Sequence, residues 1–183
     1  MNHSPLLPFD RAYWAAPDRL LAGCYPGHCD PAEAQRKLQG LLNCGVTLVL
    51  NLMAPNEVGI GGKLFVDYQA PLAELARASG RVIQFDRQPI RDMNVPSVSH
   101  MQKILDTIDQ ANASGQIVFV HCWGGKGRTG TVVGCYLARH SLAVGDAALI
   151  KLNELTEAGP YDFGPVPQTP AQCAFVRNWR PDL

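Results

Sequence analysis

His121-Cys122-Trp123-Gly124-Gly125-Lys126-Gly127-Arg128-Thr129-Gly130 is the stretch that decides the fold of this chain. Residues 117–120 before it are β-branched and aromatic, which predicts a buried strand. Residues 131–139 after it carry apolar side chains at helical spacing and no proline, which predicts a helix. The glycine-rich loop therefore lies at a helix N-terminus, where free backbone N–H groups and the helix dipole favour an anion. The stretch is predicted to hold a phosphate group.

Each residue type in this loop has its own physical role. The glycines at positions 124, 125, 127 and 130 permit positive φ and let backbone amides approach phosphate oxygens. Arg128 can donate two parallel hydrogen bonds from its planar guanidinium to one phosphate. A helix start and an arginine beside Cys122 favour the thiolate form of its side chain. Cys122 is therefore predicted to be a nucleophile that attacks phosphorus.

A nucleotide-binding loop is the competing interpretation, because Gly125-Lys126 matches part of its pattern. The pattern requires Ser or Thr after the lysine, and this chain has Gly127 there. The first glycine of the pattern would fall on Val120. The spacing therefore excludes this interpretation.

The order His-Cys-x-x-Gly-x-x-Arg-Thr-Gly resembles the signature of the cysteine-dependent protein tyrosine and dual-specificity phosphatases. The resemblance implies that Cys122 takes the phosphoryl group, that an aspartic acid protonates the leaving oxygen, and that water then hydrolyses the cysteinyl-phosphate. It also implies that Thr129 hydrogen-bonds the thiolate and that His121 supports the loop. The residues implied in substrate binding are Trp123, Gly124, Gly125, Lys126, Gly127 and Arg128.

Asp92 is the candidate for the acid. Residues 81–85 predict a strand, and the loop 89–96 leads from it to a predicted helix over 97–113. Loops that leave the carboxyl ends of parallel strands meet at one edge of a sheet, so Asp92 is expected beside Cys122 if both strands are parallel. Asp92 also resembles the mobile acid-loop aspartate of the family. Asp86 is the alternative acid, but its place near the strand end favours a local bond to the backbone.

The remaining pattern predicts a single α/β domain over residues 1–183, with residues 1–18 as an N-terminal extension. Its central, mostly parallel sheet is expected to have helices on both faces. Strands are expected near 19–23 and 45–52, and helices over 31–43, 70–78, 97–113, 131–139, 145–157 and after Thr169. Three of these helices have predicted buried faces. The buried side chains are Val98, Met101, Ile104, Leu105 and Ile108 in the helix over 97–113; Leu149, Ile150, Leu152 and Leu155 in the helix over 145–157; and Phe175, Val176 and Trp179 in the helix after Thr169.

Two polar features outside the phosphate loop have a plain structural interpretation. The loop 54–63, which follows the strand expected near 45–52, should reach the same sheet edge as Asp92. Glu57 and Lys63 in this loop could shape substrate choice, but they are interpreted as solvated surface charges. Some phosphatases of the resembled class use a glutamine to position water, and Gln168 and Gln172 are the candidates. The sequence around Gln172 favours a helix-capping role instead.

Composition excludes several classes of function. Sixteen basic and sixteen acidic residues give a formal net charge of zero. A broad nucleic-acid-binding face needs clustered basic charge, so nucleic-acid binding is not expected. Residues 1–17 lack the pattern of a signal peptide, and polar residues interrupt the charge-free interval 37–57, so no membrane span is expected. Six scattered cysteines indicate a reducing cytoplasm rather than a disulfide scaffold. Cys24, His28 and Cys29 lack the second pair of a zinc site, so neither a metal nor a cofactor is expected.

Several alternatives stay open from the sequence. The expected substrate is a phosphorylated protein or a small phosphomonoester. Lys126 resembles the lipid and inositol phosphate branch of the family, so a phosphoinositide or inositol phosphate is the alternative. A non-catalytic phosphate-binding module and a rhodanese-like sulfur transferase are further candidates. Cys24 or Cys44 could form a reversible disulfide with Cys122. The sequence does not fix an oligomeric state.

Overall fold

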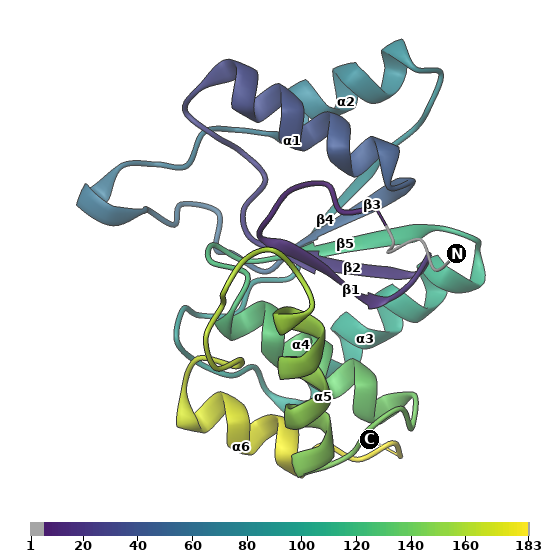
Figure 1. Ribbon diagram of the computed structural model, residues 1–183, viewed down its shortest axis with the longest axis vertical. Helices are drawn as coiled ribbons and strands as arrows, with labels where there is room; N and C mark the ends of the chain where they lie inside the picture. Colours follow the sequence, from purple (N-terminus) through teal and green to yellow (C-terminus); the bar gives the residue numbers. More distant parts are fainter. Residues whose placement is uncertain (1–5, 183) are drawn as a thin grey trace.

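Five strands form one sheet in the computed structural model, which describes residues 6–182 (Figure 1). The strands are β1 (Ala12–Ala16), β2 (Leu20–Gly23), β3 (Val46–Asn51), β4 (Gln84–Arg87) and β5 (Ile117–His121). Their order across the sheet is β1-β2-β5-β3-β4. All neighbours pair in parallel except β1 and β2, which are antiparallel. The predicted mostly parallel α/β architecture is confirmed.

Helices cover both faces of this sheet (Figure 1). On one face lie α1 (Pro31–Asn43) and α2 (Gln69–Ala78), and on the other lie α3 (Val98–Ala113), α4 (Gly127–Arg139), α5 (Asp146–Glu157) and α6 (Pro170–Asn178). A short 3-10 helix, η1 (Ile60–Gly62), lies in the long loop after β3. Each face has its own hydrophobic cluster, with Leu38, Leu72 and Phe119 in one and Ile104, Val132 and Val176 in the other. Burial of both faces explains the apolar character of β5.

Local signals set the helix boundaries. The Asp30 side chain accepts a hydrogen bond from the Glu33 N–H at 2.9 Å and caps α1. Ser97 caps α3 in the same way. At α6, Thr169 and Gln172 form a reciprocal capping box, as the sequence predicts. These caps satisfy N–H groups that the helices themselves leave free.

The first strand begins earlier than the sequence analysis expects. The strand expected near 19–23 is the second strand of the sheet, and β1 lies within the segment assigned to an N-terminal extension. Pro17 and Asp18 form the turn between the two strands, and Asp18 adopts a positive φ of 57°. The short β1 run has only five residues, so a strand there gains most of its stability from pairing with β2.

Two predictions of buried side chains are wrong. Val98 is exposed at the start of α3, and Ile150 on α5 is 62% exposed. In α5, Leu152 is buried as predicted, together with Ala148 and Thr156, and Leu149 and Leu155 pack partly buried against the core. This helix packs against α4, α6 and β1, so its inner face is set by contacts that helical periodicity alone does not fix.

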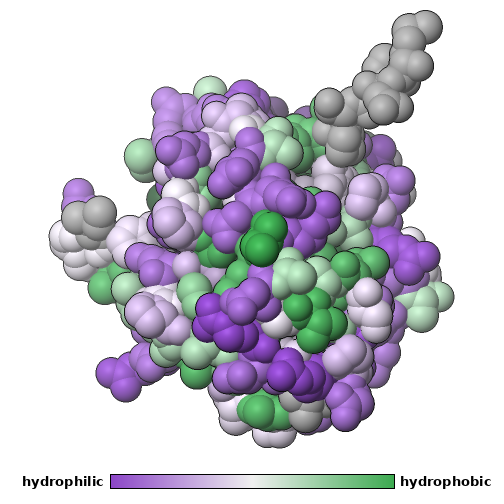
Figure 2. All heavy atoms as spheres, turned by 60° about the horizontal axis from the view of Figure 1, so that its bottom comes forward, coloured by the Kyte–Doolittle hydropathy of each residue, from purple (hydrophilic) through white to green (hydrophobic). Residues whose placement is uncertain are grey.

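The surface of the α5 and α6 side carries hydrophobic residues in small groups among hydrophilic ones (Figure 2). Singly exposed apolar side chains of this kind are normal on folded proteins. Among the residues that the structure describes, no helix combines the length and the apolar character that crossing a bilayer requires.

Candidate active site

The phosphate loop connects β5, at the centre of the sheet, to α4. Cys122 follows β5 directly and is 3% exposed. Helix α4 begins at Gly127, so Arg128, Thr129 and Gly130 lie in its first turn rather than before it. The loop proper is therefore shorter than the sequence indicates, and the N–H groups of the first turn of α4 belong to the site.

The glycines of the loop serve different purposes. Of the four, Gly125 alone has a positive φ, at 75°, so the expectation of left-handed freedom at the other three is wrong. A Cβ at Gly130 would lie 2.4 Å from Val166 Cγ1, and one at Gly127 would lie 3.0 Å from Gln172 Oε1. At these two positions the missing side chain permits close packing against α6 and the segment that leads into it.

Arg128 is held by two carboxylates. Its side chain is 1% exposed, and it donates from Nη1 and Nη2 to the two Glu57 oxygens, each at 2.7 Å. Nη2 also forms an ion pair with Asp92 Oδ1 at 2.9 Å, and Nη1 donates to the Ile90 carbonyl at 3.3 Å. The guanidinium plane is therefore fixed before any phosphate binds.

The interpretation of Glu57 as a solvated surface charge is wrong, because its side chain is only 15% exposed and pairs with Arg128. Burial alone would raise the pKa of Glu57, but the hydrogen bonds and charge of Arg128 hold it below its usual range. For Arg128, burial opposes the charged form, but Glu57, together with Cys122 and Asp92, raises its pKa overall. The sequence signal for Glu57 was its position in the loop after β3, which is expected at the same sheet edge as Asp92; what the sequence lacked was the pairing with Arg128.

Asp92 and Cys122 line the same cavity, as the strand-edge argument expects. Asp92 is 51% exposed, so its carboxyl group can reach both Arg128 and solvent. The alternative acid Asp86 accepts hydrogen bonds from the Arg87 N–H and from the Gln88 side chain, and it does not line this cavity. The structure thus places Asp92, rather than Asp86, beside the thiol.

The cavity has a volume of about 500 Å³. Its lining residues are Arg11, Asp92, Met93, Cys122, Trp123, Gly124, Lys126, Gly127, Arg128 and Gln168. Sequence reasoning missed Arg11 because it falls in the segment assigned to the extension. The antiparallel strand β1 pairs Ala12 with Gly23, so Arg11 lies beside the carboxyl end of β2. Recognition of an antiparallel edge strand would have placed Arg11 at this edge of the sheet.

His121 lies behind the loop and is fully buried. Its Nε2 shares a hydrogen bond of 2.7 Å with the Tyr68 hydroxyl, and its Nδ1 lies 3.1 Å from the Cys122 carbonyl oxygen. Burial lowers the pKa of His121 to about 3, so the ring is neutral at physiological pH. A neutral histidine in this position fixes the start of the loop rather than adding a charge to it.

Thr129 makes no hydrogen bond to Cys122 in this structure. Its Oγ1 is buried and has no hydrogen-bond partner among residues 6–182. Trp123 is partly exposed and packs edge-on against Phe65 at a centroid distance of 5.7 Å. The backbone of the loop is also held by the segment just after β2, where the Tyr25 N–H donates to the Trp123 carbonyl at 2.9 Å.

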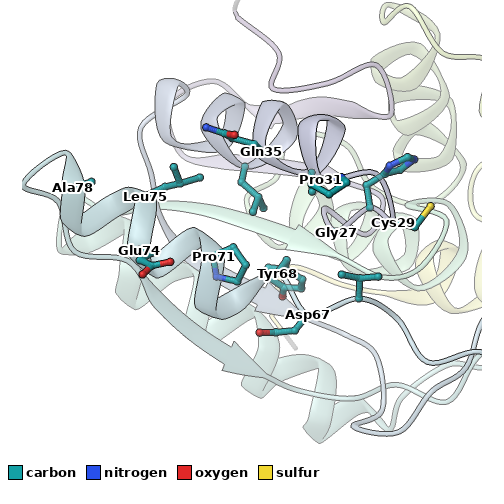
Figure 3. A pocket seen from close by; sticks show the side chains of 14 residues that line it. Gly27, Cys29, Pro31, Gln35, Asp67, Tyr68, Pro71, Glu74, Leu75 and Ala78 are labelled. Carbon is teal, nitrogen blue, oxygen red and sulfur yellow. The ribbon is translucent and has the colours of Figure 1, made fainter.

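A second cavity, of about 530 Å³, lies between α1 and α2 (Figure 3). Pro31, Pro71 and Leu75 form part of its apolar lining, with the Asp67 and Glu74 carboxylates beside them. It lies on the other face of the sheet from α4 and does not include Cys122. Within residues 6–182, no group of three or more His, Cys, Asp or Glu side chains is arranged to hold a metal ion.

Known proteins resemble this chain in sequence. The model of the family described as "Swiss Army Knife protein, DSP-PTPase phosphatase domain" matches residues 14–181. The chain is 30% identical over 136 residues to the mouse dual specificity protein phosphatase CDC14B, which covers 69% of this chain and 24% of that protein. Mouse protein tyrosine phosphatase domain-containing protein 1 is 27% identical over 134 residues, or 73% of this chain and 18% of that protein. This chain therefore spans about a quarter or less of the length of these curated relatives.

Solved structures show the same fold at low sequence identity. Tk-PTP in its active form has a TM-score of 0.70 at 21% identity, with 94% of this chain and 98% of that chain covered. TpbA of P. aeruginosa in complex with pTyr has a TM-score of 0.68 at 18% identity, with 99% and 94% covered. PTPMT1 in complex with PI(5)P has a TM-score of 0.66 at 19% identity, with 93% and 94% covered.

Proposed function

The chain belongs to the Swiss Army Knife family of dual-specificity and tyrosine phosphatase domains, and from this premise we propose that it is a cysteine-dependent phosphomonoester hydrolase. One observation carries the proposal. Cys122 and Arg128 from the phosphate loop and the first turn of α4, and Asp92 from the loop after β4, line one cavity at the carboxyl edge of the sheet. A nucleophile, a phosphate-binding fork and a proton donor are the three groups that this reaction requires.

In the first step the Cys122 thiolate attacks phosphorus, a sulfur–phosphorus bond forms, and the bond from phosphorus to the leaving oxygen breaks. The first-turn N–H groups of α4 and the Arg128 fork stabilise the phosphoryl oxygens as charge develops on them. Asp92 gives its proton to the leaving oxygen. The alcohol product therefore departs neutral.

Substrate binding also changes the partners of Asp92. In the structure the Asp92 carboxylate pairs with Arg128 Nη2, while Glu57 occupies the other side of the fork. An incoming phosphate competes with Asp92 for Arg128, and Glu57 keeps the guanidinium plane in place during the exchange. Asp92, freed from Arg128 and half exposed to solvent, takes up a proton from water and can then give that proton to the leaving group.

In the second step water attacks the cysteinyl-phosphate and gives a proton to the Asp92 carboxylate, and the bond between sulfur and phosphorus breaks. Gln168 lines the cavity and is the glutamine placed to orient this water, since Gln172 is buried in the capping box of α6. The Thr129 hydroxyl has no partner in the described chain, which leaves it available to donate to the departing thiolate.

The protein tyrosine or dual-specificity class is the first candidate for the substrate. Phosphoinositides or inositol phosphates are the second candidate, because Lys126 lines the catalytic cavity. The two solved complexes hold pTyr in one protein and PI(5)P in the other, so the shared fold accommodates both ligand classes. A non-catalytic phosphate-binding module is disfavoured, since it would not need Cys122 and Asp92 together.

Hydrolysis of an aryl phosphate by the wild type, Cys122→Ser and Cys29→Ser tests this proposal. Cys29 is an exposed thiol that lines the second cavity, so its variant is the matched control. We expect turnover by the wild type and Cys29→Ser, loss of turnover in Cys122→Ser, and a mass increase of one phosphoryl group on the Cys122 peptide after acid quench. Equal, negligible rates in the wild type and Cys122→Ser would favour the binding module.

A further inference from the structure

The cavity between α1 and α2 has no part in the reaction described above (Figure 3). Small side chains at facing positions produce it: Pro31 and Ala34 on α1, and Pro71 and Ala78 on α2. Residues three or seven positions apart lie on the same face of a helix, so each helix turns one face toward the cavity. Protein interiors rarely leave voids larger than a water molecule, and a volume of about 530 Å³ is typical of small-molecule sites.

The lining of this cavity indicates the chemistry of its ligand. Leu38, Leu75 and the Tyr68 ring provide apolar surface, whereas the carboxylates of Asp67 and Glu74 lie on the α2 side (Figure 3). Within the described chain neither carboxylate forms an ion pair, and no lysine or arginine lines the cavity. Charge complementarity therefore favours a ligand with an apolar body and one positive charge.

Asp67 is the carboxylate next to Tyr68 in the chain. Its oxygens accept hydrogen bonds from the backbone N–H groups of Gln69 and Ala70, at 3.1 Å and 3.3 Å. These bonds fix the carboxylate at the start of α2, and its oxygens keep further lone pairs for a cation. An ammonium group that pairs with Asp67 is therefore held at the end of the cavity that contains Tyr68.

Tyr68 connects this cavity to the phosphate loop. Its ring lines the cavity, and its hydroxyl shares the hydrogen bond of 2.7 Å with His121 Nε2. His121 directly precedes Cys122, and its Nδ1 lies 3.1 Å from the Cys122 carbonyl oxygen. Tyr68 is 2% exposed and His121 is fully buried. A movement of Tyr68 away from His121 would leave buried polar groups without a partner, so the two residues are expected to move together.

A ligand that fits the cavity as it stands in this structure stabilises the arrangement in which Tyr68 holds His121. The same arrangement holds the start of the loop that receives the phosphate. Because coupling between two binding sites is reciprocal, phosphate should in turn strengthen ligand binding by the same factor. One hydrogen bond transmits the effect, and its net worth corresponds to about twofold to tenfold in affinity.

We propose that the cavity between α1 and α2 is an effector site for a small amphiphilic amine, a molecule with an apolar body and one ammonium group. The bound amine pairs with Asp67, contacts the Tyr68 ring and strengthens phosphate binding through the hydrogen bond between Tyr68 and His121. The site is separate from the proposed reaction, and only its effect on hydrolysis rests on the proposed function.

Calorimetric titration of Cys122→Ser with biphenylmethylamine tests the site without turnover. The matched ligand is the neutral alcohol biphenylmethanol, and we expect the amine to bind about fivefold more tightly, which is the worth of one exposed ion pair. Ala34→Phe fills the cavity and should abolish binding. Ala32→Phe is the matched control, because Ala32 is exposed on the same helix and does not line the cavity. No saturable binding, equal binding by amine and alcohol, or binding that survives in Ala34→Phe would overturn the proposal.

Inorganic phosphate is the probe for the coupling. In the Cys122→Ser background, biphenylmethylamine should lower the Kd of phosphate about twofold to tenfold, and phosphate should lower the Kd of the amine by the same factor. Tyr68→Phe keeps the ring in the cavity but removes its bond to His121, so this variant should bind the amine without coupling. A phosphate Kd that ignores the amine, or coupling that persists in Tyr68→Phe, would refute the connection through His121.

Kinetics of the wild type separate this inference from the proposed function. The amine should lower KM for an aryl phosphate by the factor found for phosphate binding, and Ala34→Phe should remove this effect while Ala32→Phe keeps it. A wild type that hydrolyses no aryl phosphate but shows the calorimetric coupling would contradict the proposed function and support the effector site. Turnover that does not respond to the amine would contradict the effector site alone.

Discussion

Replacement of Glu57 with glutamine tests whether the catalytic arginine is positioned in advance. Glu57 accepts two hydrogen bonds of 2.7 Å from Arg128, whose side chain is only 1% exposed. A glutamine has nearly the same shape but offers one oxygen, so one of the two bonds is lost and an amide N–H faces an arginine N–H.

The magnitude follows from the character of this pair. Removal of one partner of a buried ion pair costs about 3–5 kcal/mol, and one hydrogen bond to a charged group is worth about 1.5–3 kcal/mol. Arg128 keeps its contacts with Asp92 and Ile90, and glutamine keeps one acceptor. We therefore expect Glu57→Gln to lower the free energy of unfolding by about 2 kcal/mol. A fork that is free to rotate should also lower kcat/KM for an aryl phosphate by about tenfold, or about 1.4 kcal/mol.

Acidification gives the same test a second readout. The pKa of Glu57 lies below its usual range in the folded state, so its contribution to stability is present above its unfolded pKa of about 4.3. That contribution is lost as the pH falls through the lower folded value. The free energy of unfolding of Glu57→Gln should therefore depend less on pH in this acid range than that of the wild type.

Urea unfolding and aryl phosphate kinetics provide the measurements. Glu74→Gln is the matched control, since Glu74 is exposed at the second cavity and pairs with no cation in the described structure. If Glu57→Gln unfolds at the same urea concentration as Glu74→Gln and keeps the wild-type kcat/KM, then Glu57 does not position Arg128, and the reasoning is refuted.

Three further predictions concern other parts of the site. Asp92→Asn should reduce hydrolysis of substrates with poor leaving groups by about a hundredfold and remove the basic limb of the pH–rate profile; an unchanged basic limb would rule out Asp92 as the acid. The pKa of His121 is about 3 in the folded chain and about 6.5 in the unfolded chain, so between these pH values only the unfolded chain binds the extra proton. The free energy of unfolding therefore decreases by up to about 1.4 kcal/mol for each unit by which the pH is lowered through this range. His121→Gln should reduce this slope in urea titrations at pH 7 and pH 5, and an equal slope would contradict the buried neutral ring. Gly130→Ala places a Cβ 2.4 Å from Val166 Cγ1, so thermal unfolding should show a loss of about 1–3 kcal/mol; a wild-type Tm would mean that the loop before α6 yields without cost.

Much of the fold could be predicted because its signals are local. The capping residues Asp30, Ser97 and Thr169 set helix starts through bonds to N–H groups three residues away. The apolar run of β5 and the glycines after it identified the phosphate loop. The rule that parallel strands bring their carboxyl ends to one edge also placed Asp92 beside Cys122, although 30 residues separate them.

Other parts of the site depend on contacts that no local pattern contains. Glu57 pairs with Arg128 across 71 residues of sequence, and Arg11 bonds to Gly124 across 113. In the sequence, Glu57 and Arg11 look like ordinary surface charges, because the residue that each of them bonds to lies far away in the chain. To place Arg11 in the site, the sequence would also have had to show that β1 runs antiparallel to β2. That direction is set by the turn at Pro17 and Asp18 and by the pairing of β1 with β2.

The sequence by itself determined the nucleophile Cys122, the phosphate-binding Arg128 and the strand–loop–helix unit that carries them, since these lie within ten residues and their chemistry depends on spacing along one turn. The tertiary structure alone decided what surrounds the phosphate loop: the carboxylate of Glu57 that holds Arg128, and the cation Arg11 that bonds to Gly124 and lines the same cavity. The physical reason is that charge pairing and burial depend on distance in space, and the folding of the sheet brings together charges that the sequence keeps far apart.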